Sequence, residues 1–333
     1  MTPSTNSSGL LSSALPTTYK LKSGYDIPLL GFGTWAEGAW EEAAGEWCKQ
    51  ATIAALKTGY RHIDTAWVYK VEDAVGDAIR ESGVPREEIF VTTKIWNHYH
   101  APEDVEKSLE SSLKAMKLDY VDLLLMHWPI AFKRDEKMET LLHPNGKLTD
   151  TPALQPVIDE DLSTNHVPTW RVMEALVAAG KVRSIGVSNF SIAHLSALLP
   201  HAKQPIAVNQ VEAHAWLPNN DLLAFCKKND ILMMAFSPLG GQTPSIKERL
   251  LDDPAVQQVA QSTGLDPGQV LLSWGLQRGT AVIPKSAKTS RIASNFHVQR
   301  LSGDDFDAIG SIHERKLIRL LQHFEEDWDV KIY

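Results

Sequence analysis

The chain has 333 residues, with 33 basic and 41 acidic side chains, a formal net charge of −8 and 43% hydrophobic residues. This balance is typical of a globular protein and excludes a disordered chain. The acidic charge argues against nucleic acid as a partner, because phosphate binding needs a basic face. With only two cysteines, no disulfide framework is expected.

The first segment, residues 1–17, is rich in Ser, Thr and Pro and contains no Lys or Arg. We expect it to be a flexible tail and not a targeting signal. No apolar run approaches the ~20 residues that cross a bilayer. We therefore expect no membrane partner and a cytoplasmic location. Residues 19–22 and 27–30 flank a Ser-Gly pair and predict a β-hairpin.

The rest of the chain alternates short apolar runs with amphipathic stretches. In segment 102–117, Val105, Leu109, Leu113 and Met116 lie on one helical face. Repeated strand–helix units predict a parallel sheet, and eight of them predict a (β/α)8 TIM barrel. The eight apolar runs are 30–34, 61–65, 89–95, 122–127, 184–188, 207–212, 231–237 and 281–284.

We expect residues 18–333 to form one barrel domain that includes a C-terminal extension. Two irregular loops, 130–168 and 238–250, are expected at the C-terminal face of the barrel. Two doubly wound domains are the alternative. The glycines near residue 31 lack the third member of a dinucleotide-binding loop, which disfavours that alternative.

Seven of the eight runs end in polar side chains. Each has a structural explanation on its own, such as a helix cap or an ion pair. Barrel enzymes, however, build their active sites at the C-terminal ends of the strands, so together these residues predict an active site at that end of the barrel. The residues are Asp64 with nearby Tyr69, Lys94, His127, Ser188 with Asn189, Gln210, Ser237, and Lys285 with Ser286.

Four of these residues suit proton transfer to a carbonyl oxygen. The Lys94 ammonium is expected to lower the pKa of the Tyr69 hydroxyl, and Asp64 to hold Lys94 charged. His127 would orient the second reactant or share the proton. This set predicts general acid catalysis during carbonyl reduction. Without a cysteine cluster or a His-rich segment, no metal is expected.

The end of the eighth run is basic. Lys285, Lys288 and Arg291 fall within seven positions, with Ser286 between them. Cations at a helix N-terminus predict a phosphate site, and the extra charge favours NADP over NAD. Asn295, one turn further, would face an adenine edge. The alternative is a solvated basic helix start.

At these residues the chain resembles the aldo-keto reductases over positions 18–333. The matching segments are 31–35, 59–66, 94–96, 125–129, 184–190, 209–212, 237–240 and 283–286. The resemblance implies a monomeric barrel that binds NADPH, with Tyr69 as proton donor and Asp64, Lys94 and His127 completing a tetrad. It assigns Ser188, Asn189, Gln210 and Phe236 to the nicotinamide, Ser237 and Leu239 to the pyrophosphate, Lys285, Ser286, Arg291 and Asn295 to the adenosine 2′-phosphate, and Trp35, Trp96 and Trp128 to the substrate pocket.

Within that family, segments 20–25 and 323–328 resemble fungal aldose, glyceraldehyde and uronate reductases. The implied activity is reduction of aldehyde groups of sugars, small hydroxyaldehydes or uronic acids to alcohols. Two alternatives stay open. One is an NADPH-binding regulatory subunit with little turnover. The other is an aldolase that forms a Schiff base through Lys94.

Overall fold

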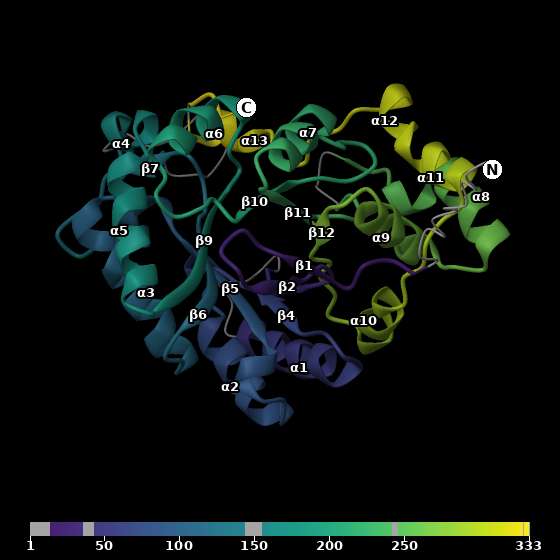
Figure 1. Ribbon diagram of the computed structural model, residues 1–333, viewed down its shortest axis with the longest axis horizontal. Helices are drawn as coiled ribbons and strands as arrows, with labels where there is room; N and C mark the ends of the chain where they lie inside the picture. The colour runs from purple at the N-terminus through teal and green to yellow at the C-terminus, as the bar shows by residue number, and fades with distance from the viewer. Residues whose placement is uncertain (1–13, 36–42, 144–154, 242–245, 329, 333) are drawn as a thin grey trace, which may run out of the picture.

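The computed structural model describes residues 14–35, 43–143, 155–241, 246–328 and 330–332. Its centre is an eight-stranded parallel sheet in the order β12-β11-β10-β9-β6-β5-β4-β3 (Figure 1). The two edge strands meet, because Val282 N donates to Leu29 O at 2.8 Å and Gly31 N donates to Val282 O at 2.9 Å. The sheet therefore closes into the predicted barrel. The strands are β3 (Phe32–Gly33), β4 (His62–Asp64), β5 (Phe90–Ile95), β6 (Val121–Met126), β9 (Val182–Ser188), β10 (Val208–Glu212), β11 (Leu232–Phe236) and β12 (Ala281–Val282).

A helix follows each barrel strand. The predicted apolar face of α3 is buried against the barrel, with Val105, Leu109 and Met116 fully inaccessible. The connecting helices are α1 (Ala43–Thr58), α2 (Glu72–Ser82), α3 (Pro102–Met116), α5 (Val167–Ala178), α6 (Ile192–Leu198), α7 (Asn220–Lys228), α9 (Pro267–Gln277) and α10 (Thr289–Phe296). At the edge of the molecule, α8 (Pro254–Thr263) and α11 (Gly303–Gly310) pack against α9 and against each other, and α12 (Ile312–Arg315) follows α11.

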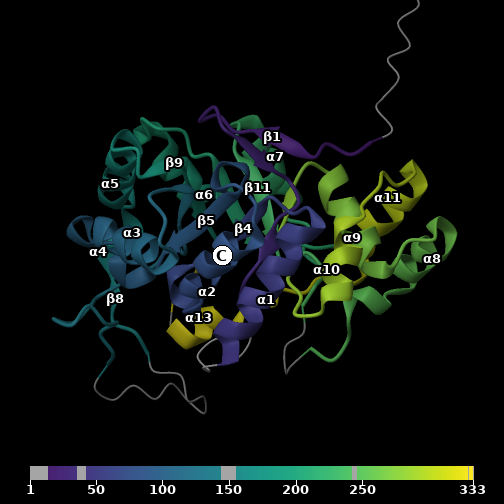
Figure 2. The ribbon, with the colours of Figure 1, turned by 90° about the horizontal axis from the view of Figure 1, so that it is seen from below.

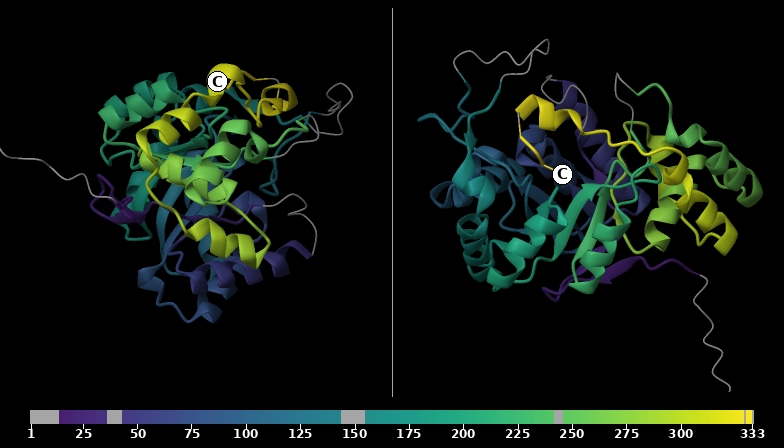
Figure 3. Two further views of the ribbon diagram at one scale, coloured as in Figure 1. Left: turned by 90° about the vertical axis from the view of Figure 1, so that its right-hand side faces the viewer. Right: turned by 90° about the horizontal axis from the view of Figure 1, so that it is seen from above.

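The two ends of the barrel are covered by opposite ends of the chain. The predicted hairpin is formed by β1 (Thr18–Lys20) and β2 (Asp26–Pro28), which pair antiparallel. Ser23 Oγ lies 2.6 Å from Ser184 Oγ, near the start of β9, so the hairpin sits at the N-terminal end. The last helix, α13 (His323–Trp328), lies at the opposite end (Figures 2 and 3). Residues 1–13 of the expected tail lie outside the described residues.

The expected irregular loop 130–168 is partly regular. Strands β7 (Ala131–Phe132) and β8 (Ile158–Asp159) pair antiparallel, and the short helix α4 (Glu160–Thr164) follows. Further bridges join Arg134 to Thr140 and Leu142 to Pro156. The expectation of irregular structure is thus wrong for the described part, because strands of two residues leave no alternating pattern in the sequence. Residues 144–154 of this loop and 242–245 of the other are outside the described residues.

No helix in the described part of the chain is long and apolar enough to cross a membrane.

Candidate active site

The four residues of the predicted tetrad lie together at the C-terminal end of the barrel. Asp64 ends β4, Lys94 lies near the end of β5, and His127 follows β6. Tyr69 ends the 3₁₀ turn after β4. Lys94 Nζ donates to Asp64 Oδ1 at 2.6 Å and lies 3.5 Å from Tyr69 Oη. The rings of Tyr69 and His127 meet edge to face, with centroids 5.7 Å apart.

Lys94 and Asp64 form a buried ion pair, with 1% and 2% of each residue exposed. Burial on its own would lower the pKa of the Lys94 ammonium. The adjacent Asp64 carboxylate and Tyr69 hydroxyl outweigh that effect and raise the pKa of Lys94 above its ordinary value. Lys94 is therefore a permanently charged donor in the neutral range, as the sequence predicts.

The Tyr69 hydroxyl differs from the prediction. Burial raises its pKa above the ordinary value, and the charge of Lys94 opposes this rise without reversing it. The expectation of a lowered pKa is wrong, because the depth of burial of the phenol cannot be read from the sequence. The hydroxyl is consequently protonated at neutral pH, which is the state a proton donor needs.

His127 is a neutral imidazole. Burial, and after it the charge of Lys94, place its pKa well below the ordinary value. Its Nδ1 atom is buried and has no hydrogen-bond partner among the described residues. The second oxygen of the Asp64 carboxylate accepts a hydrogen bond from Gln210 Nε2 at 2.6 Å. Asp64 thus links the tetrad to a residue assigned to the nicotinamide site.

Ser188 and Asn189 lie beside the tetrad at the end of β9. Asn189 Nδ2 donates to His127 O at 2.9 Å, and Ser188 Oγ donates to Gln210 O at 2.8 Å. Asn189 Oδ1 is buried and has no hydrogen-bond partner in the described structure. A buried amide oxygen without a donor carries a free-energy cost, and an incoming carboxamide N–H would remove it. The residues present therefore fit a nicotinamide at this position.

The other residues assigned to the cofactor follow along the ends of β11 and β12. Phe236 and Leu239 are half-buried, and Ser237 has a left-handed backbone with its carbonyl bonded to Gly240 N. Lys285 and Arg291 are exposed, at the end of β12 and on the first turn of α10. Ser286 Oγ accepts from Lys288 N at 3.0 Å, and Asn295 is buried on α10.

The three tryptophans assigned to the substrate pocket separate into two groups. The ring of Trp96 meets that of His127 edge to face with centroids 5.2 Å apart, and the buried ring of Trp128 stacks with the same imidazole at 6.4 Å. Trp35 is 53% exposed and makes no ring contact with either of them within the described residues. Trp96 and Trp128 are thus brought to the tetrad, and the assignment of Trp35 stays a prediction.

Residues missed by the sequence reasoning join these two tryptophans. Trp328, on α13, has its ring centroid 5.0 Å from that of Trp128 and 6.3 Å from that of Trp96. Phe132, on β7, also packs against Trp328. The aromatic content of the last segment was the only sequence feature that pointed to Trp328. It indicates that the rings of that segment are buried but does not show which residues they contact.

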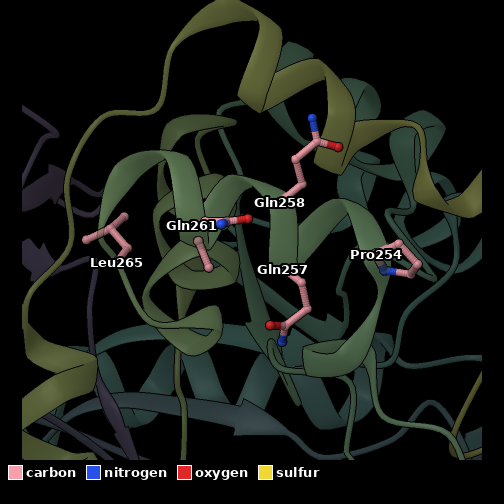
Figure 4. A pocket seen from close by; sticks show the side chains of 6 residues that line it. Pro254, Gln257, Gln258, Gln261 and Leu265 are labelled. Atoms are coloured by element: carbon pink, nitrogen blue, oxygen red, sulfur yellow. The ribbon is translucent and has the colours of Figure 1, made fainter.

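A hollow of about 650 Å³ lies elsewhere, on the outer surface around α8 (Figure 4). Its lining consists of Pro254, Gln257, Gln258, Ala260, Gln261 and Leu265. It contains no ionisable side chain and is remote from the barrel end that carries the tetrad, so it is not the reaction site.

A known family of enzymes matches this barrel. The family described as "Aldo/keto reductase family" matches residues 29–314, and the chain belongs to that family.

Characterised relatives match nearly the whole chain. A "Glycerol 2-dehydrogenase (NADP(+))" from Hypocrea jecorina is 47% identical, over 91% of this chain and 94% of that protein. A "D-galacturonate reductase" from the same organism is 42% identical, over 87% of this chain and 88% of that protein. Among solved structures, the aldose reductase of Schistosoma japonicum superposes with a TM-score of 0.82 at 33% identity, covering 95% of this chain and 97% of that one. The chain is therefore an enzyme of the oxidoreductase class.

Proposed function

We propose that the protein is an NADPH-dependent reductase that converts the aldehyde group of a small sugar, hydroxyaldehyde or uronic acid to an alcohol. The observation that carries this proposal is the arrangement around Lys94 Nζ, 2.6 Å from Asp64 Oδ1 and 3.5 Å from Tyr69 Oη. A protonated phenol beside a fixed ammonium is suited to protonate an oxygen that gains negative charge.

Each side chain has a distinct part in this reaction. Bound NADPH would supply the hydride to the carbonyl carbon. Tyr69 Oη donates its proton to the carbonyl oxygen, and Lys94 stabilises the phenolate that remains. Asp64 keeps Lys94 charged and in place. His127, neutral because of its burial, holds the carbonyl oxygen by hydrogen bonding without competing for the proton.

Two observations support the cofactor assignment. Asn189 Oδ1, which has no hydrogen-bond partner among the described residues, suits a carboxamide N–H. Exposed Lys285 and Arg291 lie at the start of α10, where a phosphate would meet both cations and helix amides. The name of the glycerol dehydrogenase relative gives NADP(+) as its cofactor. We extend that choice to this chain.

The names of the relatives support the substrate class. One acts on glycerol and another on D-galacturonate, which are small polyhydroxy compounds. In this chain the rings of Trp96 and Trp128 both lie beside the His127 ring and would contact the carbon face of such a substrate. We infer that an aldehyde with adjacent hydroxyls is the preferred reactant.

Tyr69→Phe tests the proposal. This variant removes the donor proton and keeps the ring that packs on His127. We expect kcat for DL-glyceraldehyde to fall by about 10²–10⁴-fold, while the fluorescence change on NADPH binding is retained. Turnover equal to that of the wild type would refute the role of Tyr69. NADPH binding without turnover in the wild type, on any aldehyde, would favour the regulatory subunit.

The aldolase alternative has an observation against it. A Schiff base requires a neutral amine, whereas Asp64 and Tyr69 keep the pKa of Lys94 above its ordinary value. Borohydride treatment in the presence of glyceraldehyde should leave Lys94 unmodified. A trapped adduct at Lys94 would reverse this conclusion.

A further inference from the structure

We propose that Glu212 is a positioning residue that controls substrate selectivity, because its carboxylate fixes the C-terminal segment over the substrate site. This inference rests on the proposed reductase function for its kinetic consequence. The structural argument depends only on the contacts of Glu212. This residue was assigned neither to the tetrad nor to the cofactor site.

Glu212 is the last residue of β10 and is 1% exposed. Its Oε1 accepts from Leu320 N at 2.7 Å and from His214 Nε2 at 2.9 Å. Its Oε2 accepts from Leu321 N at 3.1 Å. A buried carboxylate is stable only when its oxygens are hydrogen-bonded, and bonds to an ionised acceptor are the stronger kind. The two consecutive amides of the segment are therefore held firmly at the barrel rim.

The anchored segment leads directly to the aromatic cluster over the tetrad. Two residues after Leu321, α13 begins, and its Phe324 and Trp328 pack on Trp128 with ring centroids 5.2 and 5.0 Å away. Trp328 also meets Trp96, whose ring lies 5.2 Å from that of His127. The chain of contacts thus runs from Glu212 through the segment to the ring beside the tetrad.

The segment has two other kinds of attachment. Lys316 pairs with Glu248 at 3.2 Å and Arg315 with Asp253 at 3.1 Å, but both cations are solvent-accessible, and exposed ion pairs contribute little. The rings of Phe324 and Trp328 pack in the aromatic cluster, which holds α13 through side chains and not through the amides of Leu320 and Leu321. A helix of six residues such as α13 is also marginal by itself. Removal of the Glu212 contacts should therefore loosen the chain just before α13 and shift the Trp328 ring relative to Trp96 and Trp128.

Glu212→Gln is the variant that tests this, since it keeps the volume of the side chain and turns one acceptor into an N–H donor. We expect the KM for glyceraldehyde and for galacturonate to rise by about tenfold or more and to change by different factors. We expect kcat to change less than threefold and NADPH affinity less than twofold.

The matched control is Glu174→Gln. Glu174 Oε1 likewise accepts from two consecutive amides, Lys203 N at 2.6 Å and Gln204 N at 2.9 Å, but it lies on α5 and contacts no residue of the C-terminal segment within the described structure. Its KM values should equal those of the wild type. An equal KM rise in Glu174→Gln would show a general loss of packing and overturn the proposal.

A double-mutant cycle with Trp328→Ala tests whether Glu212 affects the substrate site through the Trp328 ring. If Glu212 acts through this ring, Trp328→Ala raises KM in the wild type and adds little in Glu212→Gln. Independent, multiplicative effects would overturn the proposal. If Glu212→Gln does not fold, Leu321→Pro removes one of the two amide donors and Leu321→Ala removes most of the same side chain, which packs on the aromatic cluster, but keeps the amide. The KM rise should appear in Leu321→Pro and be much smaller in Leu321→Ala, and equal rises would overturn the proposal.

Hydrogen exchange separates this inference from the proposed function. The amides of Leu320 and Leu321 should be protected in the wild type and in Glu174→Gln, and should exchange at least tenfold faster in Glu212→Gln. Unchanged protection would overturn the anchor. Faster exchange with unchanged KM would overturn the selectivity role alone. A wild type that reduces no aldehyde would refute the reductase function, and the selectivity role with it.

Discussion

At the scale of single residues, the buried pair of Lys94 and Asp64 serves both chemistry and stability. Taking two charges out of water is costly, and the 2.6 Å contact offsets that cost only while both partners are present. The same contact keeps the ammonium charged beside Tyr69. Function and folding therefore depend on one interaction, so a single substitution should damage both.

Lys94→Met leaves the Asp64 carboxylate buried without its cation. We expect the free energy of unfolding at pH 7 to fall by roughly 3–5 kcal/mol, together with loss of aldehyde reduction. Urea denaturation followed by tryptophan fluorescence measures the first effect and NADPH oxidation the second.

The double variant Lys94→Met/Asp64→Asn removes both charges. It should regain most of the lost stability and remain inactive. Stability that stays as low in the double variant as in Lys94→Met would show that packing of the lysine, and not the unpaired charge, is responsible.

At the scale of an element, the first turn of α10 combines helix amides with cations. Arg291→Ala should weaken NADPH binding by about tenfold or more and leave NADH binding within twofold, because only NADPH carries the 2′-phosphate. Quenching of tryptophan fluorescence gives both dissociation constants. Arg300→Ala, an equal change in charge beyond the end of α10, is the control. An equal effect of both variants would indicate long-range charge in place of a local contact.

The packing of α2 on α3 depends on a glycine. A Cβ on Gly76 would lie 2.1 Å from the backbone oxygen of Met116 at the end of α3, so the two helices would have to separate. Gly76→Ala should lower the free energy of unfolding by about 1–3 kcal/mol or more.

Gly45→Ala is the comparison, because among the described residues no atom beyond its own helix and chain neighbours lies within 4 Å of a Cβ at that helical position. It should raise stability by up to about 1 kcal/mol. Thermal unfolding of both variants measures the difference. A mild effect at Gly76 would mean that α2 can shift away from α3.

The amphipathic helices and the strand ends could be predicted, because the sequence patterns that indicate them are local. The buried face of α3 follows from its periodicity, and the polar ends of seven of the eight runs can be read directly from the sequence. Parallel strands bring their ends to one rim, which is why Lys94 meets Asp64. The link from Glu212 to Leu320 was not predictable, since it joins residues far apart in sequence that share no pattern. The prediction of a lowered pKa for Tyr69 was wrong for a similar reason. The direction of the shift depends on how deeply neighbouring elements bury the ring, and this burial cannot be read from the sequence.

At the scale of the whole molecule, buried histidines should determine how stability responds to acid. Burial lowers the pKa of His98 to about 4 and that of His100 to about 3, and it lowers those of His62, His127 and His166 as well. Below their ordinary pKa of 6.5 the unfolded chain binds protons that the folded chain does not. Stability therefore falls as the pH decreases from about 6.5 towards 3.

We expect each such histidine to contribute at most about 1.4 kcal/mol per pH unit to this slope. The buried Glu72 acts in the opposite direction, because burial raises the pKa of its carboxyl, but it is a single group and the buried histidines are several.

His100→Phe keeps a buried planar ring and removes one titrating site. Unfolding between pH 6 and 4 should therefore take up about one proton fewer, and the slope of stability against pH should decrease accordingly. Urea denaturation at intervals of half a pH unit measures this slope. His201→Gln, at an exposed position, should leave it unchanged. A slope that is the same in His100→Phe and the wild type would show that His100 is not among the groups that make the fold sensitive to acid.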